Sequence, residues 1–408
     1  MSISRLGTAN MYDRTITNIN KQQSELASQM EHTSAGMRVI RASDDPVAAA
    51  QAERARNRLE RIASDQRGLD AQTATITYGE STLGEINEAL QEFRSLMVQA
   101  GSGVYNQVQR DTLVEQLTSL REQIAKYANR TDSNGLPLFR GLDTATGMPF
   151  PNDQEGIQSG QTDNGEFFIA NTLNGVHAFF SGKTGNGVLE IDPYSHAAGV
   201  PNQGKAHADI GVIKDPAAAA AATVTTPIEI TFRDNAGAME YTVDGGTTWA
   251  AYKAGAAIEV AGMEVVIKGE PAAGDGFTIK PSETISTFEA LDRAIAAVRD
   301  NGNDDGSTAY GTLAHGITKS LTELDTALNR VSTVRGLAGD LLVQAERMGA
   351  TLLAREEQTE AQRVAAEQYD AEGMVRAISQ MQTQQTAVSA ALQSYASIQK
   401  LSLFNYIS

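Results

Sequence analysis

The spacing of hydrophobic residues divides this chain into three parts. From the N-terminus to about residue 142, and from about residue 286 to the C-terminus, apolar side chains recur at the three- and four-residue intervals of amphipathic helices. Between these arms, apolar and polar residues alternate, which is typical of half-buried strands. The alternating positions are Ile228, Ile230 and Phe232, followed by Met239, Tyr241 and Val243. We therefore expect an α+β fold in which both chain ends build a long-helix coiled-coil bundle around an inserted, mainly antiparallel β domain.

Glycine-containing turns separate the predicted strands. They lie at residues 235–237, 244–246 and 274–276, where glycine supplies the backbone conformations that tight turns require. The middle of the chain is therefore predicted to be a meander or a sandwich. The alanine run at residues 217–222 predicts a linker.

The first arm has the most regular pattern of the sequence, an apolar residue at every seventh position. These residues are Ile62, Leu69, Ile76, Leu83, Leu90 and Met97. A seven-residue repeat predicts a helix with one packing stripe. Because polar residues such as Gln66 and Thr73 occupy the second seam position, we expect a mixed bundle and no self-sufficient two-stranded zipper. A second helix, with its stripe from Leu113 to Tyr127, is expected to lie antiparallel to the first after a break at residues 101–103.

The second arm predicts a short helix and then a very long one. Ser286 and Glu289 form a capping box before a helix whose apolar face includes Leu291. No proline interrupts the chain from Leu321 to Ser408, which predicts one continuous helix. At about 1.5 Å per residue such a rod would exceed about 100 Å, a length that suits the wall of a filament or tube.

The two chain ends form a matched pair of one-sided amphipathic helices. The seam candidates are Ile16, Ile19, Leu26 and Met30 with Ile378, Met381, Leu392 and Tyr395. Because Gln23 and Gln385 interrupt the stripes, the pair is expected to be weak alone. We expect both ends to be disordered in the free monomer and to order against neighbouring subunits, with an ordinary two-helix pair as the alternative.

These patterns predict three layers. They are terminal coiled-coil segments (residues 1–43 with 366–408), a helical core domain (44–149 with 285–365) and a β-rich outer domain (150–284).

Composition narrows the set of partners. The net charge of -17 disfavours nucleic acid and anionic lipid, and no basic cluster reverses it locally. No stretch approaches the roughly 18 apolar residues of a membrane helix, so we expect no membrane insertion. Residues 1–30 lack the continuous apolar core of a cleavable signal peptide, so an exported chain would use another route.

The residues that usually carry catalysis are absent or scattered. The chain has no cysteine, which excludes disulfides and sulfur-based zinc sites. The five histidines are widely spaced, and no His-Glu-x-x-His motif is present. We therefore predict no enzyme, no cofactor and no metal site, and interpret each histidine as a packing or surface residue.

Residues Ser34 to Ala50 read SAGMRVIRASDDPVAAA and contain a helix start. Asp45 is expected to cap the next helix, with Pro46 at its first position. Asp44 adds negative charge at the positive end of the helix dipole.

This segment resembles the N-terminal signature of hook-associated proteins in the flagellin superfamily. Asn134 to Gly141 (NGLPLFRG) is similar to the turn that ends the N-side core helices of that superfamily, and Gly269 to Ile279 (GEPAAGDGFTI) to a strand-turn motif of its outer domains. Leu401 to Ile407 (LSLFNYI) resembles the end of the hook-filament junction proteins, the third hook-associated proteins. Flagellins usually continue Lys-Asp-Asp-Ala where this chain has Asp44-Asp45-Pro46-Val47, so the resemblance favours the junction proteins.

The resemblance implies a structural adaptor that joins the hook to the flagellar filament. Its partners would be the first hook-associated protein, flagellin and further copies of itself in a ring-like or helical assembly. It also implies export through the flagellar type III apparatus, with a cytoplasmic chaperone on the C-terminal segment, and an extracellular location at the junction.

Two other functions stay open. A flagellin-type filament subunit is the nearer alternative. An adhesive or glycan-binding surface protein is the farther one, with Trp249, Tyr241 and Tyr252 as a sugar-stacking face.

Overall fold

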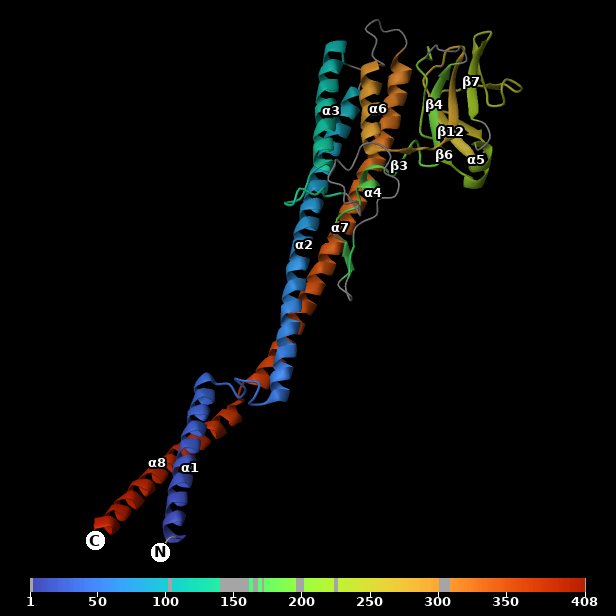
Figure 1. Ribbon diagram of the computed structural model, residues 1–408. Helices are drawn as coiled ribbons and strands as arrows, with labels where there is room; N and C mark the ends of the chain where they lie inside the picture. Colours follow the sequence, from blue (N-terminus) through green and yellow to red (C-terminus); the bar gives the residue numbers. More distant parts are fainter. Residues whose placement is uncertain are drawn as a thin grey trace. The chain divides into compact units, whose positions relative to one another are not determined.

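The protein is seen in a computed structural model that describes residues 3–101, 105–139, 161–163, 168–170, 172–195, 202–223, 227–300 and 309–407. It forms two compact units, unit 1 (Met1–Gly68 with Met348–Ser408) and unit 2 (Leu69–Arg347). Two long helices, α2 (Pro46–Ala100) and α7 (Ala309–Glu367), contribute residues to both units (Figure 1). Helices at both ends with an antiparallel β domain between them confirm the predicted α+β class.

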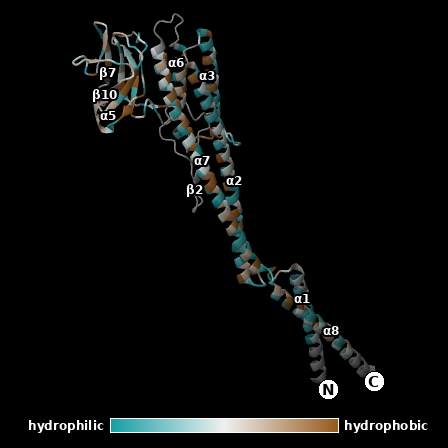
Figure 2. Ribbon diagram, turned by 180° about the vertical axis from the view of Figure 1, so that it is seen from behind, coloured by the Kyte–Doolittle hydropathy of each residue, from teal (hydrophilic) through white to brown (hydrophobic). Residues whose placement is uncertain are grey.

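The helical part of unit 2 combines residues of α2 and α7 with α3 (Gln107–Ala128) and α6 (Thr287–Asp300). The predicted stripes are buried: Leu83, Leu90 and Met97 of α2 are fully covered, and Leu117 and Ile124 of α3 likewise. Brown patches recur along α2 and α7 in Figure 2 and mark these apolar positions. A helix this long gains its stability from burying one stripe, so the stripe fixes which face points inward.

Charged pairs and caps set the helix partners and ends in unit 2. Arg94 on α2 forms a bidentate ion pair with Asp325 on α7, with hydrogen bonds of 2.7 and 3.2 Å. Arg121 on α3 forms a second bidentate pair with Asp292 on α6. The backbone N–H of Glu289 donates to Ser286 Oγ at 3.0 Å, which confirms the Ser286 half of the predicted capping box, and the Glu289 carboxylate accepts from Arg293 at 2.8 Å.

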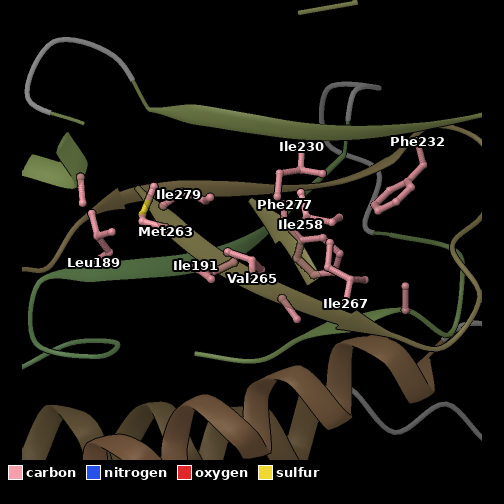
Figure 3. Close-up of a cluster of buried hydrophobic side chains, with 13 residues drawn as sticks. Leu189, Ile191, Ile230, Phe232, Ile258, Met263, Val265, Ile267, Phe277 and Ile279 are labelled. Carbon is pink, nitrogen blue, oxygen red and sulfur yellow. The ribbon is translucent and has the colours of Figure 1, made fainter. Parts of the chain in front are cut away.

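The β domain is a sandwich of two antiparallel sheets. The first sheet has the order β4-β12-β7-β8-β9, and the second contains β10, β11, β5 and β6. The bounds are β4 (Leu189–Ser195), β5 (His207–Ala208), β6 (Val212–Ile213), β7 (Ile228–Asn235), β8 (Ala238–Thr242), β9 (Ala250–Ala251), β10 (Ala257–Val260), β11 (Met263–Lys268) and β12 (Asp275–Pro281). Side chains from both sheets meet in one apolar cluster, in which Ile230, Val265 and Phe277 are almost fully buried (Figure 3).

The described part of unit 2 contains further short elements. They are β1 (Gln161–Asp163), β2 (Phe168–Ala170), α4 (Gly175–Phe179), β3 (Gly182–Lys183), α5 (Pro216–Thr223) and β13 (Thr284–Ile285). The predicted turn at residues 235–237 is confirmed as the β7–β8 hairpin, where Ala236 and Gly237 both have positive φ, at 55° and 88°. Positive φ at both central positions matches the twist of the flanking strands.

Two predictions about continuity are wrong. The alanine run is the helix α5 and no linker, because the Asp215 carboxylate accepts from the backbone of Ala217 and Ala218 and Pro216 begins the helix. The C-terminal stretch is two helices, α7 and α8 (Ala371–Ile407), and not one. The interruption at residues 368–370 has a cause outside the stretch, described below.

A buried polar seat holds the sandwich on the helices of unit 2. His315 on α7 is nine-tenths buried, and its ring nitrogens lie 2.9 Å from the Ile191 carbonyl oxygen and 3.3 Å from that of Ala208. Burial lowers the pKa of His315, so the neutral ring donates to one strand at a time. This packing role is what the sequence predicted for the residue.

Around His315 lie six charged side chains from four elements. They are Glu190 and Asp192 on β4, Lys280 on β12, Arg293 on α6, and Lys319 and Glu323 on α7. Lys319 contacts Glu190 and lies 2.5 Å from Asp192. Three acids therefore face three bases, with Glu289 adding a fourth acid at Arg293.

Within this group of charged side chains, Glu323 has both carboxylate oxygens without a hydrogen-bond partner. Both oxygens are buried, and the Arg293 guanidinium is 3.8 Å away. Burial raises the pKa of Glu323 to about 7, although Lys319 and Arg293 oppose the shift. The folded protein therefore binds a proton here that the unfolded chain releases near its ordinary value.

Glu323→Gln is expected to flatten the dependence of stability on pH. Because the pKa of Glu323 is higher in the folded state, the wild-type free energy of unfolding falls as pH rises from about 4.5 through about 7, and then levels off. The amide should therefore add roughly 1–3 kcal/mol at pH 8 and much less near pH 5. Urea unfolding at both pH values measures this, with the exposed Glu115→Gln as control. Parallel pH curves for wild type and Glu323→Gln would contradict the assignment.

Candidate assembly surface

Unit 1 begins with α1 (Ile3–Ala35), which ends in a sharp elbow. Gly36 has a φ of +67°, and the N–H groups of Gly36 and Met37 return to the carbonyls of Thr33 and His32, a glycine-type helix end. The chain then runs extended beside the end of α7. This elbow, residues 36–45, connects α1 to α2.

The elbow is what interrupts the C-terminal arm. The N–H groups of Arg38 and Val39 both donate to the Glu367 carbonyl, and Tyr369 N–H donates to the Gly36 carbonyl. A carbonyl used in this way is not available to continue the helix, so α7 ends at Glu367. Asp370 then caps α8, accepting from Gly373 N–H at 2.7 Å.

The predicted helix-start motif has its expected role at Asp45 and Pro46. Asp45 Oδ1 accepts from the N–H groups of Val47 and Ala48, and α2 begins at Pro46. The Ala48 N–H and the Arg38 guanidinium hold the pKa of Asp45 below its usual range. Asp44 turns back into the elbow, where the Arg41 N–H lowers the pKa of its carboxyl.

Glu367 fixes the elbow from the side-chain side as well. Its carboxylate is almost fully buried, 2.5 Å from Arg56 of α2 and 2.8 Å from Arg363 of α7. One residue therefore joins the elbow by its carbonyl and two helices by its carboxylate.

The terminal helices α1 and α8 pack together along a narrow contact. Ile19 is buried, together with Ala377 and Val388. Leu26, Met381 and Tyr395 are half-buried. Four seam candidates remain largely exposed: Ile16 at 40%, Met30 at 50%, Ile378 at 38% and Leu392 at 44%. The structure thus brings half of the eight candidates toward the α1–α8 contact and leaves the other half facing outward.

Sequence reasoning missed Ala377, a small residue of α8 that is buried beside α1. Ala377 is small enough for α1 to cross α8 there, and its carbonyl accepts from Gln29 Nε2 at 3.4 Å. An alanine on an amphipathic face is weak as a signal, because its burial depends on which helix crosses it. The Gln384 side-chain oxygen Oε1, next to the predicted interruption at Gln385, is shielded from solvent without a hydrogen bond.

No group of three or more His, Asp or Glu side chains among the described residues is placed to hold a metal ion. None of the helices in the described ranges is long and apolar enough to cross a membrane. What unit 1 presents is an apolar and polar helix surface suited to other helices.

Glu367→Ala is expected to loosen the elbow. Removing the carboxylate leaves Arg56 and Arg363 without their shared partner, so local opening of residues 36–45 becomes easier. Trypsin cleavage after Arg38 and Arg41 should become at least about 10-fold faster under native conditions. Glu357→Ala, an exposed position on the same helix, serves as control. Equal cleavage rates for both variants would show that Glu367 does not hold the elbow.

Comparison with known proteins agrees with this architecture. Residues 6–144 match the family model described as the bacterial flagellin N-terminal helical region. The chain is 28% identical over 233 residues to flagellar hook-associated protein 3 of Salmonella typhimurium, covering 55% of this chain and 68% of the relative. It is 27% identical over 249 residues to the Escherichia coli K12 protein of the same name, covering 59% and 74%. A flagellin of Escherichia coli O127:H6 is 26% identical over 340 residues, covering 79% and 60%.

Solved structures share the fold. The crystal structure of flagellar hook associated protein-3 from Legionella pneumophila aligns with a TM-score of 0.66 at 23% identity, over 76% of this chain and 97% of that chain. The crystal structure of FlgL from Xanthomonas campestris aligns with a TM-score of 0.62 at 21% identity, over 77% of this chain and 99% of that chain. The chain is thus similar in sequence to proteins named flagellar hook-associated protein 3, its residues 6–144 match the flagellin N-terminal helical region, and it shares its fold with the solved structures.

Proposed function

We propose that this protein is a structural adaptor subunit of the bacterial flagellum that joins the hook to the flagellin filament. The observation that carries the proposal is the incomplete α1–α8 seam, in which Ile16, Met30, Ile378 and Leu392 stay 38–50% exposed. Homology to proteins named flagellar hook-associated protein 3 supplies the context.

A half-exposed seam leaves apolar surface in contact with water in a monomer, whereas neighbouring subunits can cover that surface in a polymer. Burying large apolar side chains contributes about 25 cal/mol per Å² of area removed from water. The α1–α8 contact leaves much of that area unused on the outward faces of both helices. Helices of neighbouring subunits would complete the burial, as in other repeated head-to-tail contacts.

The partners proposed are the first hook-associated protein on one side, flagellin on the other and further copies of this chain laterally. The exposed apolar residues of α1 and α8 support our proposal that residues 1–43 and 366–408 order only on assembly. A cytoplasmic chaperone would hold the C-terminal segment before type III export. The location proposed is the extracellular junction.

No catalytic role is proposed. The relatives are named as structural parts of the flagellum, and the chemistry of the described surface is that of helix packing.

The adhesive alternative loses its proposed site. Tyr252 is half-buried, its hydroxyl donates to the carbonyls of Ile267 and Gly269, and its ring packs edge-on against Phe232. The Arg233 guanidinium covers Trp249 at 3.9 Å. Tyr241 packs on the sandwich core. Each of the three rings is therefore already in contact with another side chain of the domain, which disfavours a sugar-stacking face built from them.

Ile378→Asp is expected to block assembly without blocking secretion. An unpaired carboxylate in a helix interface costs several kcal/mol, whereas Ile378 is already 38% exposed in the single chain. In cells that lack the native protein, the amount of variant in isolated flagella should fall at least about 10-fold while the secreted amount is unchanged.

Ser379→Asp, the exposed neighbouring position, is the matched control and should assemble normally. Normal assembly of Ile378→Asp would remove the seam from the proposal. Long filaments grown from the purified wild-type chain alone would favour the flagellin alternative.

A further inference from the structure

Helix α2 carries a stripe of like charges in unit 1. Arg54, Arg58 and Arg61 are spaced at i, i+4 and i+7, which places them on one face of the helix. All three are exposed, and within the described ranges none has an acidic group within 4 Å. Arg56, on a different face, is the arginine of this region that pairs with Glu53 and Glu367.

Two of these arginines line a groove. Arg58 and Arg61 face Arg355 of α7 across a groove of about 350 Å³, with Gln358 and Gln362 on its α7 side and Asp65 as its acidic member. We name these six residues the arginine groove. Like charges three and four residues apart destabilise a helix, so the stability of the single chain does not account for them. A partner that brings negative charge would account for these like charges.

The chain has such charge in its other unit. Unit 1 contains 14 of the 33 basic and 14 of the 50 acidic residues, so it is neutral and the whole net charge of -17 belongs to unit 2. On α2 itself, Glu88 and Glu92 form an exposed i, i+4 pair without a basic group within 4 Å in the described part of the chain. Their neighbours Glu80 and Glu85 are already paired, with Arg335 and Arg130.

We propose that the arginine groove of one copy receives Glu88 and Glu92 of a neighbouring copy. The contact joins the N-terminal part of α2 in one subunit to the C-terminal part of α2 in the next. It is heterologous, because the two faces differ, and therefore repeats from copy to copy into a ring or tube. Guanidinium and carboxylate groups suit it, since they form two parallel hydrogen bonds.

This inference rests on the proposed self-assembly and adds its polarity and its residues. The spacing supports it: an i, i+4 pair of carboxylates matches arginines spaced three and four residues apart. An acidic segment of another flagellar subunit is the competing occupant of the groove.

Charge reversal tests the contact in the full chain, expressed in cells that lack the native protein. Arg58→Glu with Arg61→Glu should reduce the amount in isolated flagella at least about 10-fold, and Glu88→Arg with Glu92→Arg should do the same. A chain with all four reversals should return to within about 2-fold of wild type, because both faces are inverted together. All positions are exposed, so secretion reports that each variant is made and exported.

Glu60→Arg with Arg67→Glu, exposed positions on the other side of α2, is the matched control. Wild-type assembly of either double reversal would overturn the inference. Failure of the fourfold variant while both doubles fail would also overturn it, in favour of an acidic partner of another kind. If the wild-type chain itself were missing from flagella, the proposed function would fail instead.

Discussion

Neither arm of this chain can bury its apolar stripe alone, and the rest of the structure depends on that constraint. A 55-residue α2 and a 59-residue α7 each have one buried face, so each needs partners from the other end of the sequence. The chain inserted between the two helical arms must therefore leave the helices and return to them at the same place. The short β3–β13 pair does this, with Lys183 opposite Thr284 and Gly182 opposite Ile285. It joins the two connections of the sandwich at its base.

The same constraint explains where polar groups are buried. The sandwich seats on α6 and α7 through His315 and a set of charges, and not through a second apolar core. Buried ion pairs contribute little net stability but penalise wrong arrangements, because a displaced charge loses its partner. In unit 1, Glu367 acts in a similar way, by joining the elbow to two helices.

Much of the fold could be predicted from local sequence, and the exceptions share a physical cause. The α2 repeat, the Ser286 cap and the Asp45 cap depend on residues within one or two turns, so their patterns are visible in the chain. The interruption after Glu367 depends on backbone groups of residues 36–39, far away in sequence. Glu323 lies four residues after Lys319, the spacing of an ordinary exposed ion pair on a helix. Its burial depends on the fold and is not visible in that spacing.

The candidate assembly surface could likewise be predicted only in part from the sequence. The periodicity of the terminal helices indicated which faces are apolar, but not which residues the two helices would cover for each other. Ala377 is buried and the adjacent Ile378 is 38% exposed. The α5 region shows the converse, because Asp215 and Pro216 form a local helix start that the alanine composition of the run obscured.

The central claim is that this chain is required between hook and filament and nowhere else in the flagellum. Electron microscopy of cells lacking the chain, with an assay of flagellin in the medium, tests it most directly. The account predicts that hooks persist, filaments are missing and flagellin accumulates outside the cell. Filaments that remain attached, or hooks that are missing as well, would contradict the adaptor function.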